Sequence, residues 1–399
     1  MPTHRTTRGT SGGLPARQLL VGLALGTALT AAAVGGLASA PATASLAAAP
    51  AAAPPPAPDD RLPACAAVVG AMTPRERLAQ RLMVGVDAAD VDGTAAVVRA
   101  VQPGGVFLGG NAAALLTDQA LRGVQASARI PVTVAVDDEG GRVQRVDDLD
   151  GDLPSAREMA ELSPREVRAL AEERGGALAA RGVTMDIAPV VDLGGQPRRA
   201  VIGDRAFAED PASVTEYALA FAQGLGDAGV ASVVKHFPGH GRADGDSHQG
   251  RVTSPPLDAL RGADLRPYAD LVGPGRPLAD GGTAVMVGHL DVPGLTADLP
   301  SSLTPAVYAL LRDEIGFDGA VMTDDLGAMD AITDAHPLPD AVRAALAAGA
   351  DVALWSDPDD PAPVLAELER ALADGRLDPA ANDASVVRVL RAKGACGTP

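Results

Sequence analysis

The sequence predicts an α/β protein whose folded body is a single (β/α)8 barrel of the TIM type. Three observations predict this fold. Short segments rich in β-branched residues alternate with segments of helical period along the body of the chain. Eight such strand segments occur, each followed by a helix-like stretch, and closure at eight indicates a barrel. Polar residues gather just after the strand segments, at the end where barrels build their active sites.

The expected strands are spaced so that a helix fits between successive ones. Strands are expected at Leu82–Val86, Gly105–Leu108, Val132–Val136, Met185–Val191, Ser232–Phe237, Ala284–Leu290, Ala320–Thr323 and Val352–Trp355. Expected helices include Pro164–Arg181, Ser213–Ala228, Thr304–Ile315 and Ala341–Ala348. Ser163 and Thr304 each precede a proline, and a capping residue before a proline at the first helical position is typical of a helix N-terminus.

The chain in front of this body is predicted to be an export signal and a spacer. Residues 1–44 have a basic start, an apolar run from Leu19 to Leu37 and an ending rich in small residues, which is typical of a secretory signal peptide. The alternative is a membrane anchor that stays attached. Residues 45–60 form an Ala/Pro-rich linker, and the folded domain is expected at residues 61–399. We expect the protein to be secreted or associated with the cell envelope, with no stable membrane span after signal cleavage.

Composition and charge exclude several classes of partner. The formal net charge is −18, whereas a nucleic-acid partner requires clustered positive charge, so none is expected. Aromatic residues make up 2% of the chain, which argues against a long polysaccharide groove and favours a small polar pocket. Of 33 cationic residues only Lys235 and Lys393 are lysines, so the lysine at 235 departs from the usage of the rest of the chain.

The two cysteines, Cys65 and Cys396, stand near the two ends of the folded body. A barrel closes by placing its last helix beside its first elements, so a disulfide between them is expected in an oxidising compartment. Two alternatives stay open. In the first, both thiols are free. In the second, Cys65 is a lipid-attachment site, but it lies farther from the apolar run than is usual for such a site.

The densest polar motif reads Lys-His-Phe-Pro-Gly-His-Gly from Lys235 to Gly241 and is followed by Asp-Ser-His from Asp246 to His248. Three of the six histidines fall within 13 positions here. A metal site is the alternative interpretation. However, Lys235 would repel a cation and no spacing matches a helical His pair, so neither a metal nor another cofactor is expected.

Three further motifs follow predicted strands. Residues 136–145 read Val-Asp-Asp-Glu-Gly-Gly-Arg-Val-Gln-Arg, where the glycines allow a sharp turn after the strand. Residues 322–329 contain the carboxylate pair Asp324–Asp325, and residues 202–207 read Ile-Gly-Asp-Arg-Ala-Phe. Five candidates fall at C-terminal ends of predicted strands and are expected to meet at one rim of the barrel: Asp137, Lys235, His236, His289 and Asp324.

In order and spacing, the four motifs resemble the β-N-acetylglucosaminidase branch of glycoside hydrolase family 3 over about residues 72–350. In this branch an Asp-Ser-His sequence ends the loop after the fifth strand, and its histidine replaces the carboxylic acid/base of other members. Those members often carry a second domain, for which this chain has no room. The resemblance implies that Asp324 is the nucleophile of a retaining mechanism, that His248 is the acid/base and that Asp246 orients it.

The resemblance also implies which residues bind the terminal sugar. Four of them match family positions that hold its hydroxyls: Asp137, Arg205, Lys235 and His236. His289, at the end of the sixth strand, is expected to line the same pocket. Asp138 stands where the family usually has Gln, which predicts an extra charge near the pocket.

The function expected from this resemblance is that of an exo-acting β-N-acetylglucosaminidase in peptidoglycan turnover, working as a monomer without a cofactor. Its carbohydrate partner would be a GlcNAc-containing oligosaccharide or a muropeptide. One alternative is a substrate-assisted or phosphate-accepting β-N-acetylhexosaminidase. The other is a wall-sugar-binding protein without catalysis, against which the intact set of Asp246, His248 and Asp324 argues.

Overall fold

The computed structural model describes residues 61–110, 114–279 and 282–397. The predicted signal peptide, residues 1–44, and the predicted linker, residues 45–60, lie outside the described residues. Among the helices that are described, none combines the length and the apolar character that a membrane span requires.

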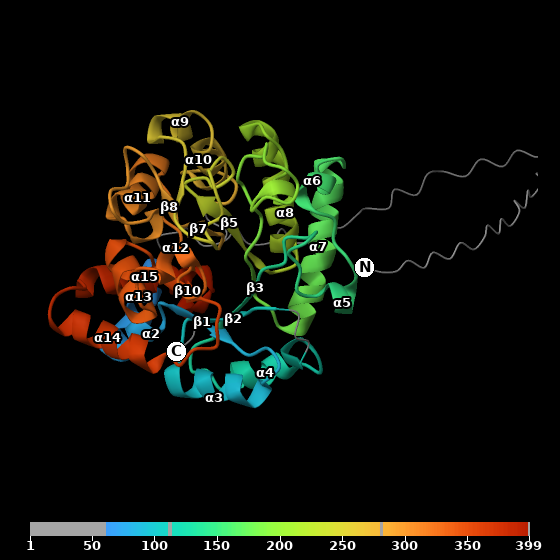
Figure 1. The fold of residues 1–399 in the computed structure, drawn as a ribbon. Helices are drawn as coiled ribbons and strands as arrows, with labels where there is room; N and C mark the ends of the chain where they lie inside the picture. The colour runs from blue at the N-terminus through green and yellow to red at the C-terminus, as the bar shows by residue number, and fades with distance from the viewer. Residues whose placement is uncertain (1–60, 111–113, 280–281, 398–399) are drawn as a thin grey trace, which may run out of the picture. The chain divides into compact units, whose positions relative to one another are not determined.

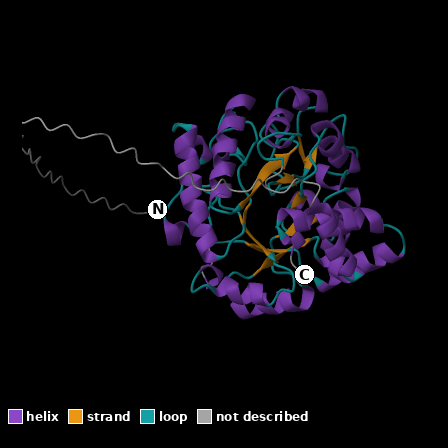
Figure 2. Ribbon diagram, turned by 180° about the vertical axis from the view of Figure 1, so that it is seen from behind, coloured by secondary structure: helices purple, strands orange, loops and turns teal. Residues whose placement is uncertain are grey.

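Eight parallel strands close into a barrel in the order β1–β10–β9–β7–β5–β4–β3–β2, and Figure 2 shows their ring surrounded by helices. The strands are β1 Leu82–Val86, β2 Gly105–Leu108, β3 Thr133–Val136, β4 Met185–Asp186, β5 Ala231–Phe237, β7 Ala284–Val287, β9 Val321–Asp325 and β10 Val352–Trp355. The predicted (β/α)8 fold is therefore confirmed.

The helices lie outside this ring (Figure 1). They are α1 Arg61–Ala71, α2 Pro74–Ala79, α3 Val91–Val101, α4 Ala120–Ala126, α5 Asp147–Asp150, α6 Ala156–Met159, α7 Pro164–Arg181, α8 Pro211–Asp227, α9 Leu257–Gly262, α10 Leu265–Val272, α11 Pro305–Ala309, α12 Asp330–Thr333, α13 Leu338–Ala348, α14 Ala362–Ala373 and α15 Pro379–Ala392. Short 3₁₀ turns occupy Ala114–Leu116, Gly203–Arg205, Ser301–Leu303 and Ala395–Gly397.

Helix α7 has the bounds that the sequence predicts, because its start is well capped. The Ser163 side chain accepts from the backbone N–H of Glu166, whose carboxylate accepts in return from Ser163. The prediction for Thr304 is only partly right. Its hydroxyl donates to carbonyls that precede it rather than capping the helix, and the predicted helix divides into α11 and a π-helical turn at Leu310–Ile315.

Two predicted strands differ from the structure. Within Met185–Val191 the regular strand β4 is two residues long, because the proline at 189 has no N–H for the ladder, and pairing with β5 resumes as a single bridge at Val190. The predicted strand Ala284–Leu290 divides into β7 and β8, Leu290–Asp291. Strand β8 leaves the barrel and pairs with β6, Val252–Thr253, in a two-stranded sheet. This sheet ties the loop after β5 to the loop after β7.

Two apolar layers stabilise the barrel. Its interior is filled by side chains such as Met83, Met185, Met286 and Met322, and methionine adapts to the irregular space inside a ring. A larger buried cluster separates the strands from the surrounding helices. Burial of apolar surface contributes about 25 cal/mol per Å², so these layers fix the frame on which the rim residues stand.

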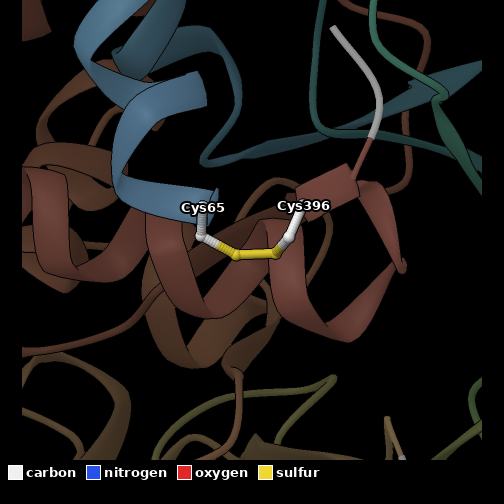
Figure 3. Close-up of a disulfide and its surroundings, with 2 residues drawn as sticks. All are labelled: Cys65 and Cys396. Atoms are coloured by element: carbon white, nitrogen blue, oxygen red, sulfur yellow. A yellow bond between two sulfur atoms is a disulfide. The ribbon is translucent and has the colours of Figure 1, made fainter. Parts of the chain in front are cut away.

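Cys65 in α1 and Cys396 in the last 3₁₀ turn form a disulfide, shown in Figure 3. Their Cα atoms lie 4.4 Å apart although 331 positions separate them in sequence. Helix α1 packs against α15 beside the bond, so the start and the end of the described chain are neighbours. The pairing agrees with the expectation that barrel closure brings the two cysteines together.

Candidate active site

A cavity of about 290 Å³ opens at the C-terminal ends of the barrel strands. Such a volume lies at the small end of ligand pockets and suits a single sugar ring. Its wall includes six of the predicted site residues, which are Asp137, Arg205, Lys235, His236, His248 and Asp324. The fold thereby brings together residues that lie up to 187 positions apart in the sequence, since Asp137 and Asp324 line the same cavity.

Lys235, at the end of β5, stands between two carboxylates. Its Nζ lies 2.5 Å from Oδ1 of Asp137 and 2.5 Å from Oε1 of Glu139. Arg205 binds the same Glu139 with two hydrogen bonds of 2.7 Å. Burial raises the pKa of Glu139, but the adjacent Arg205 and Lys235 outweigh it and hold that pKa far below its ordinary value. The network therefore stays charged, and the positive charges of Lys235 and Arg205 are balanced by the neighbouring carboxylates.

Glu139 is a residue whose role the sequence reasoning missed. It was part of the motif after β3, yet its contacts lie with Arg205 and Lys235, which are 66 and 96 positions away. The signal available was its place two residues after Asp137, on a turn that leads away from a strand end. The glycines that follow have positive φ values, 92° at Gly140 and 59° at Gly141, which let the chain turn there.

His236 is oriented by a second buried carboxylate, that of Asp192. Its Nδ1 lies 2.7 Å from Oδ2 of Asp192, and its backbone N–H donates to the same oxygen at 3.3 Å. Nδ1 therefore carries the ring hydrogen, which leaves Nε2 as an acceptor, 3.4 Å from Nη2 of Arg205. Sequence reasoning did not single out Asp192, although it directly follows the predicted fourth strand.

Asp324 belongs to β9 and has one fixed hydrogen bond, from the backbone N–H of Asp325 to Oδ1 at 2.9 Å. Burial raises the pKa of Asp324, but the electrostatic effect of the nearby His236 and His289 rings, together with the hydrogen bond from the Asp325 N–H, lowers it to about 2. The carboxylate is therefore ionised at neutral pH. An ionised carboxylate at the wall of a sugar-sized cavity can act as a nucleophile.

The side chain of Asp325 faces the turn that follows the strand. Its Oδ1 accepts from the backbone N–H groups of Gly327 at 2.8 Å, Ala328 at 3.1 Å and Ser356 at 3.3 Å. This carboxylate fixes the turn after Asp324 and joins it to the end of β10.

His289 differs from the expectation that it lines the pocket. It is 1% exposed and is absent from the cavity wall. Its Nε2 lies 2.9 Å from the carbonyl oxygen of Asp325, and its Nδ1 lies 2.7 Å from Oγ of Ser302. Burial lowers its pKa, so the ring is neutral and supports the segment that bears Asp324 from behind.

Asp246 and His248 form a pair on the loop after β5. His248 Nδ1 lies 2.7 Å from Oδ1 of Asp246, and its backbone N–H donates to the same oxygen at 3.0 Å. Only His248 contributes to the cavity wall, and Asp246 lies behind it. With Nδ1 bonded to the carboxylate, Nε2 is the nitrogen left for a ligand. This is the arrangement in which an acid orients a histidine base.

The predicted extra charge at Asp138 does not reach the pocket. Its side chain is fully buried, and Oδ2 lies 3.2 Å from Nη1 of Arg174. Its Oδ1 accepts from the backbone N–H of Arg145 at 2.6 Å, and its own N–H donates to Asp186. The expectation of a charge near the ligand is corrected, because Arg174 neutralises this carboxylate beneath the wall.

Arg145 is a second residue whose role the sequence reasoning missed. It lines the cavity, and among the described residues no carboxylate forms an ion pair with it. Its Nη1 donates to the carbonyl of Gln144 at 2.8 Å, whereas its Nε has no hydrogen-bond partner among the described atoms. The Nη groups of this guanidinium, rather than its buried Nε, are available to hydroxyl or carbonyl groups of a ligand in the cavity.

Comparison with known proteins adds independent findings. A model of the glycosyl hydrolase family 3 N-terminal domain matches residues 73–392. The β-hexosaminidase LpqI of Mycobacterium tuberculosis is 48% identical over 338 residues, which cover 82% of this chain and 85% of that protein. Its structure agrees with a TM-score of 0.79 and covers 84% of this chain and 97% of that chain. The β-N-acetylhexosaminidase structure from Beutenbergia cavernae is 32% identical, with a TM-score of 0.71, over 81% of this chain and 99% of that one.

Proposed function

The chain belongs to glycoside hydrolase family 3 and is a glycoside hydrolase; on that premise, we propose that it is an exo-acting, retaining β-N-acetylglucosaminidase. It removes a terminal, non-reducing β-linked GlcNAc. The observation that carries the proposal is that an ionised carboxylate, Asp324, and a carboxylate-bonded imidazole, His248, line one cavity with room for one sugar. The printed names of the relatives, β-hexosaminidase and β-N-acetylhexosaminidase, support the choice of sugar.

In the first step, Asp324 attacks the anomeric carbon as the glycosidic C–O bond breaks. His248 gives the proton on Nε2 to the leaving oxygen, and a covalent glycosyl ester forms on the carboxylate. In the second step, Nε2 takes a proton from water, the water oxygen bonds to the anomeric carbon and Asp324 leaves. Configuration is retained because each of the two displacements inverts the anomeric carbon. Imidazole suits both steps, since it gives and accepts protons near neutral pH.

The other polar groups of the wall hold the sugar. Lys235 and Arg205 are compensated by Asp137 and Glu139, so they present directed donors to hydroxyls without a large net charge. His236 offers Nε2, and Arg145 offers unused donors. Such a set of opposed donors and acceptors favours a neutral polyhydroxylated ring over an anion.

The first test compares wild type, Asp324→Ala and His248→Ala on an unactivated GlcNAc disaccharide, after release of 4-nitrophenol from its β-N-acetylglucosaminide has established the activity of wild type. We expect both variants to lose most turnover of an unactivated disaccharide, and undiminished turnover by either would contradict the assignment. The second test is mass spectrometry after incubation with a 2-deoxy-2-fluoro glycoside, which should leave a glycosyl ester on the peptide that contains Asp324. Recovery of unmodified peptide would favour hydrolysis assisted by the acetamido group of the substrate. Phosphate dependence of the products would favour transfer to phosphate.

We further propose that the protein is exported, acts as a monomer and turns over peptidoglycan fragments. The signal-like composition of residues 1–44 supports export. The test compares kcat/KM for GlcNAc-containing muropeptides with kcat/KM for chitobiose. A strong preference for chitobiose would overturn the peptidoglycan role and leave the glycosidase assignment intact.

A further inference from the structure

We propose that Ser247 and His240 act as positioning residues, whose buried hydrogen bond holds the Asp246–His248 pair over the cavity. The inference rests on the proposed function, in which that pair supplies the acid and base. It gives a role to the second histidine of the Lys-His-Phe-Pro-Gly-His-Gly motif, which is not part of the cavity wall.

Ser247 separates the two residues of the pair, and its side chain lies in a different environment. Ser247 is 1% exposed, whereas the side chain of His248 is 58% exposed and that of Asp246 31%. The three residues belong to a turn in which the backbone N–H of Gln249 donates to the carbonyl of Asp246 at 2.9 Å. Fixing one central residue of a turn fixes the direction in which the other one points.

The partner of Ser247 is the imidazole of His240, with Oγ and Nε2 2.9 Å apart. His240 is 2% exposed, and its Nδ1 has no hydrogen-bond partner among the described atoms. The contact with Ser247 is therefore the one hydrogen bond of this ring in the described part of the chain. The serine hydroxyl can donate or accept, so the contact holds in either tautomer of the ring.

His240 is itself fixed by Asp192, the carboxylate that orients the sugar-binding His236. Oδ1 of Asp192 accepts from the backbone N–H of His240 at 2.6 Å, and Oδ2 bonds to Nδ1 of His236 at 2.7 Å. One buried carboxylate thus sets the position of a wall residue and of the ring beneath the turn. The position of the Asp246–His248 pair relative to the sugar-binding His236 is therefore set by contacts through Asp192, His240 and Ser247.

Other bonds attach the backbone of the turn to α12 and to the loop beyond it. The carbonyl of Ser247 accepts from the N–H of Ala331 at 3.2 Å, and the carbonyl of His248 lies 3.5 Å from the N–H of Asp330. Farther along, Arg251 pairs with Asp291 and extends the attachment to the β6–β8 sheet. Loss of the Ser247 hydroxyl would therefore leave the loop attached while His248 spends less time over the glycosidic bond.

The test uses Ser247→Ala, with Ser247→Thr as the conservative variant that restores a hydroxyl. Ser254→Ala is the matched control, because its hydroxyl lies on the same loop and donates only to the carbonyl of Pro255. The readout is kcat/KM, which reports bond cleavage up to the glycosyl-enzyme, for chitobiose and for the 2,4-dinitrophenyl glycoside. Departure of dinitrophenolate requires little proton donation, whereas departure of a sugar requires it.

We expect Ser247→Ala to lose on the order of tenfold in kcat/KM for chitobiose, the loss that one hydrogen bond brings, and much less for the dinitrophenyl glycoside. Ser247→Thr should restore most of the loss, and Ser254→Ala should change neither value. His240→Asn, which removes the ring from the other side, should reproduce the pattern if Ser247→Ala does not fold. Equal losses on both substrates, or none, would overturn the inference. If His248→Ala also fails to discriminate between the substrates, the proposed function fails as well.

Discussion

Replacing Glu139 by Gln would test whether the buried charge network is as tightly coupled as its geometry indicates. Gln keeps the shape of the side chain but removes the anion that accepts two hydrogen bonds from Arg205 and one from Lys235. Hydrogen bonds to charged groups contribute about 1.5–3 kcal/mol each, and breaking a buried pair by removing one partner costs about 3–5 kcal/mol. We expect the free energy of unfolding of Glu139→Gln to fall by about 3–5 kcal/mol.

The assay is thermal unfolding followed by circular dichroism, supported by urea titration. In a body of this size each kcal/mol shifts Tm by roughly 1.5–2 °C, so Tm should fall by roughly 5–10 °C. The control is Glu369→Gln, which removes an exposed partner of Arg75 and should cost about 0–1 kcal/mol.

The pH dependence supplies a second readout with a definite sign. The pKa of Glu139 is lowered in the folded protein, so the stability that its charge contributes is complete above its ordinary pKa, 4.5, and is lost as pH falls toward the lower folded value. The difference between wild type and Glu139→Gln should be constant from pH 6 to 8 and shrink below about pH 4.5. A variant as stable as wild type at pH 7, or a difference unchanged at pH 3, would refute the reasoning.

Three further predictions concern single contacts. Arg145→Ala should lower kcat/KM about 10- to 100-fold, mainly through KM, with Tm nearly unchanged, because its guanidinium has unused donors at the cavity wall; an unchanged KM would remove it from the binding site. His289→Asn should lower kcat more than it raises KM, since the ring supports the Asp325 carbonyl and does not line the cavity; a selective rise in KM would restore the expected binding role. Cys65→Ser should reduce the free energy of unfolding by about 2–5 kcal/mol and leave kcat at 25 °C unchanged, and equal stability in urea would contradict this.

The fold could be predicted because its signals are local. Strands β1, β2 and β10 have the predicted bounds, since each is a short apolar run buried on both faces. The division between β7 and β8 could not be predicted in this way, because it depends on pairing with β6, some 38 positions earlier. The side-chain cap expected of Thr304 is missing for a similar reason, since the carbonyls that occupy its hydroxyl come from the preceding turn.

The candidate site could be predicted as far as strand ends determine it. Side chains that follow a strand at the C-terminal rim, such as Asp137, Lys235 and Asp324, were identified and do meet at one cavity. The roles of Glu139 and Asp192 were missed because they exist only across elements, through partners in another part of the chain. The same rule predicts His289 at the pocket, but the strand leaves the barrel after Val287, and the His289 ring lies against the carbonyl of Asp325.

The disulfide between α1 and the last 3₁₀ turn makes residues 65–396 a covalent ring, as Figure 3 shows at its point of closure. A protease that cuts one surface loop of such a ring produces no separate fragments. The nicked molecule gains only the mass of one water, and its two segments separate only after reductant is added. A single cut would open the chain at that loop, and the Cys65–Cys396 disulfide would still join the two resulting segments.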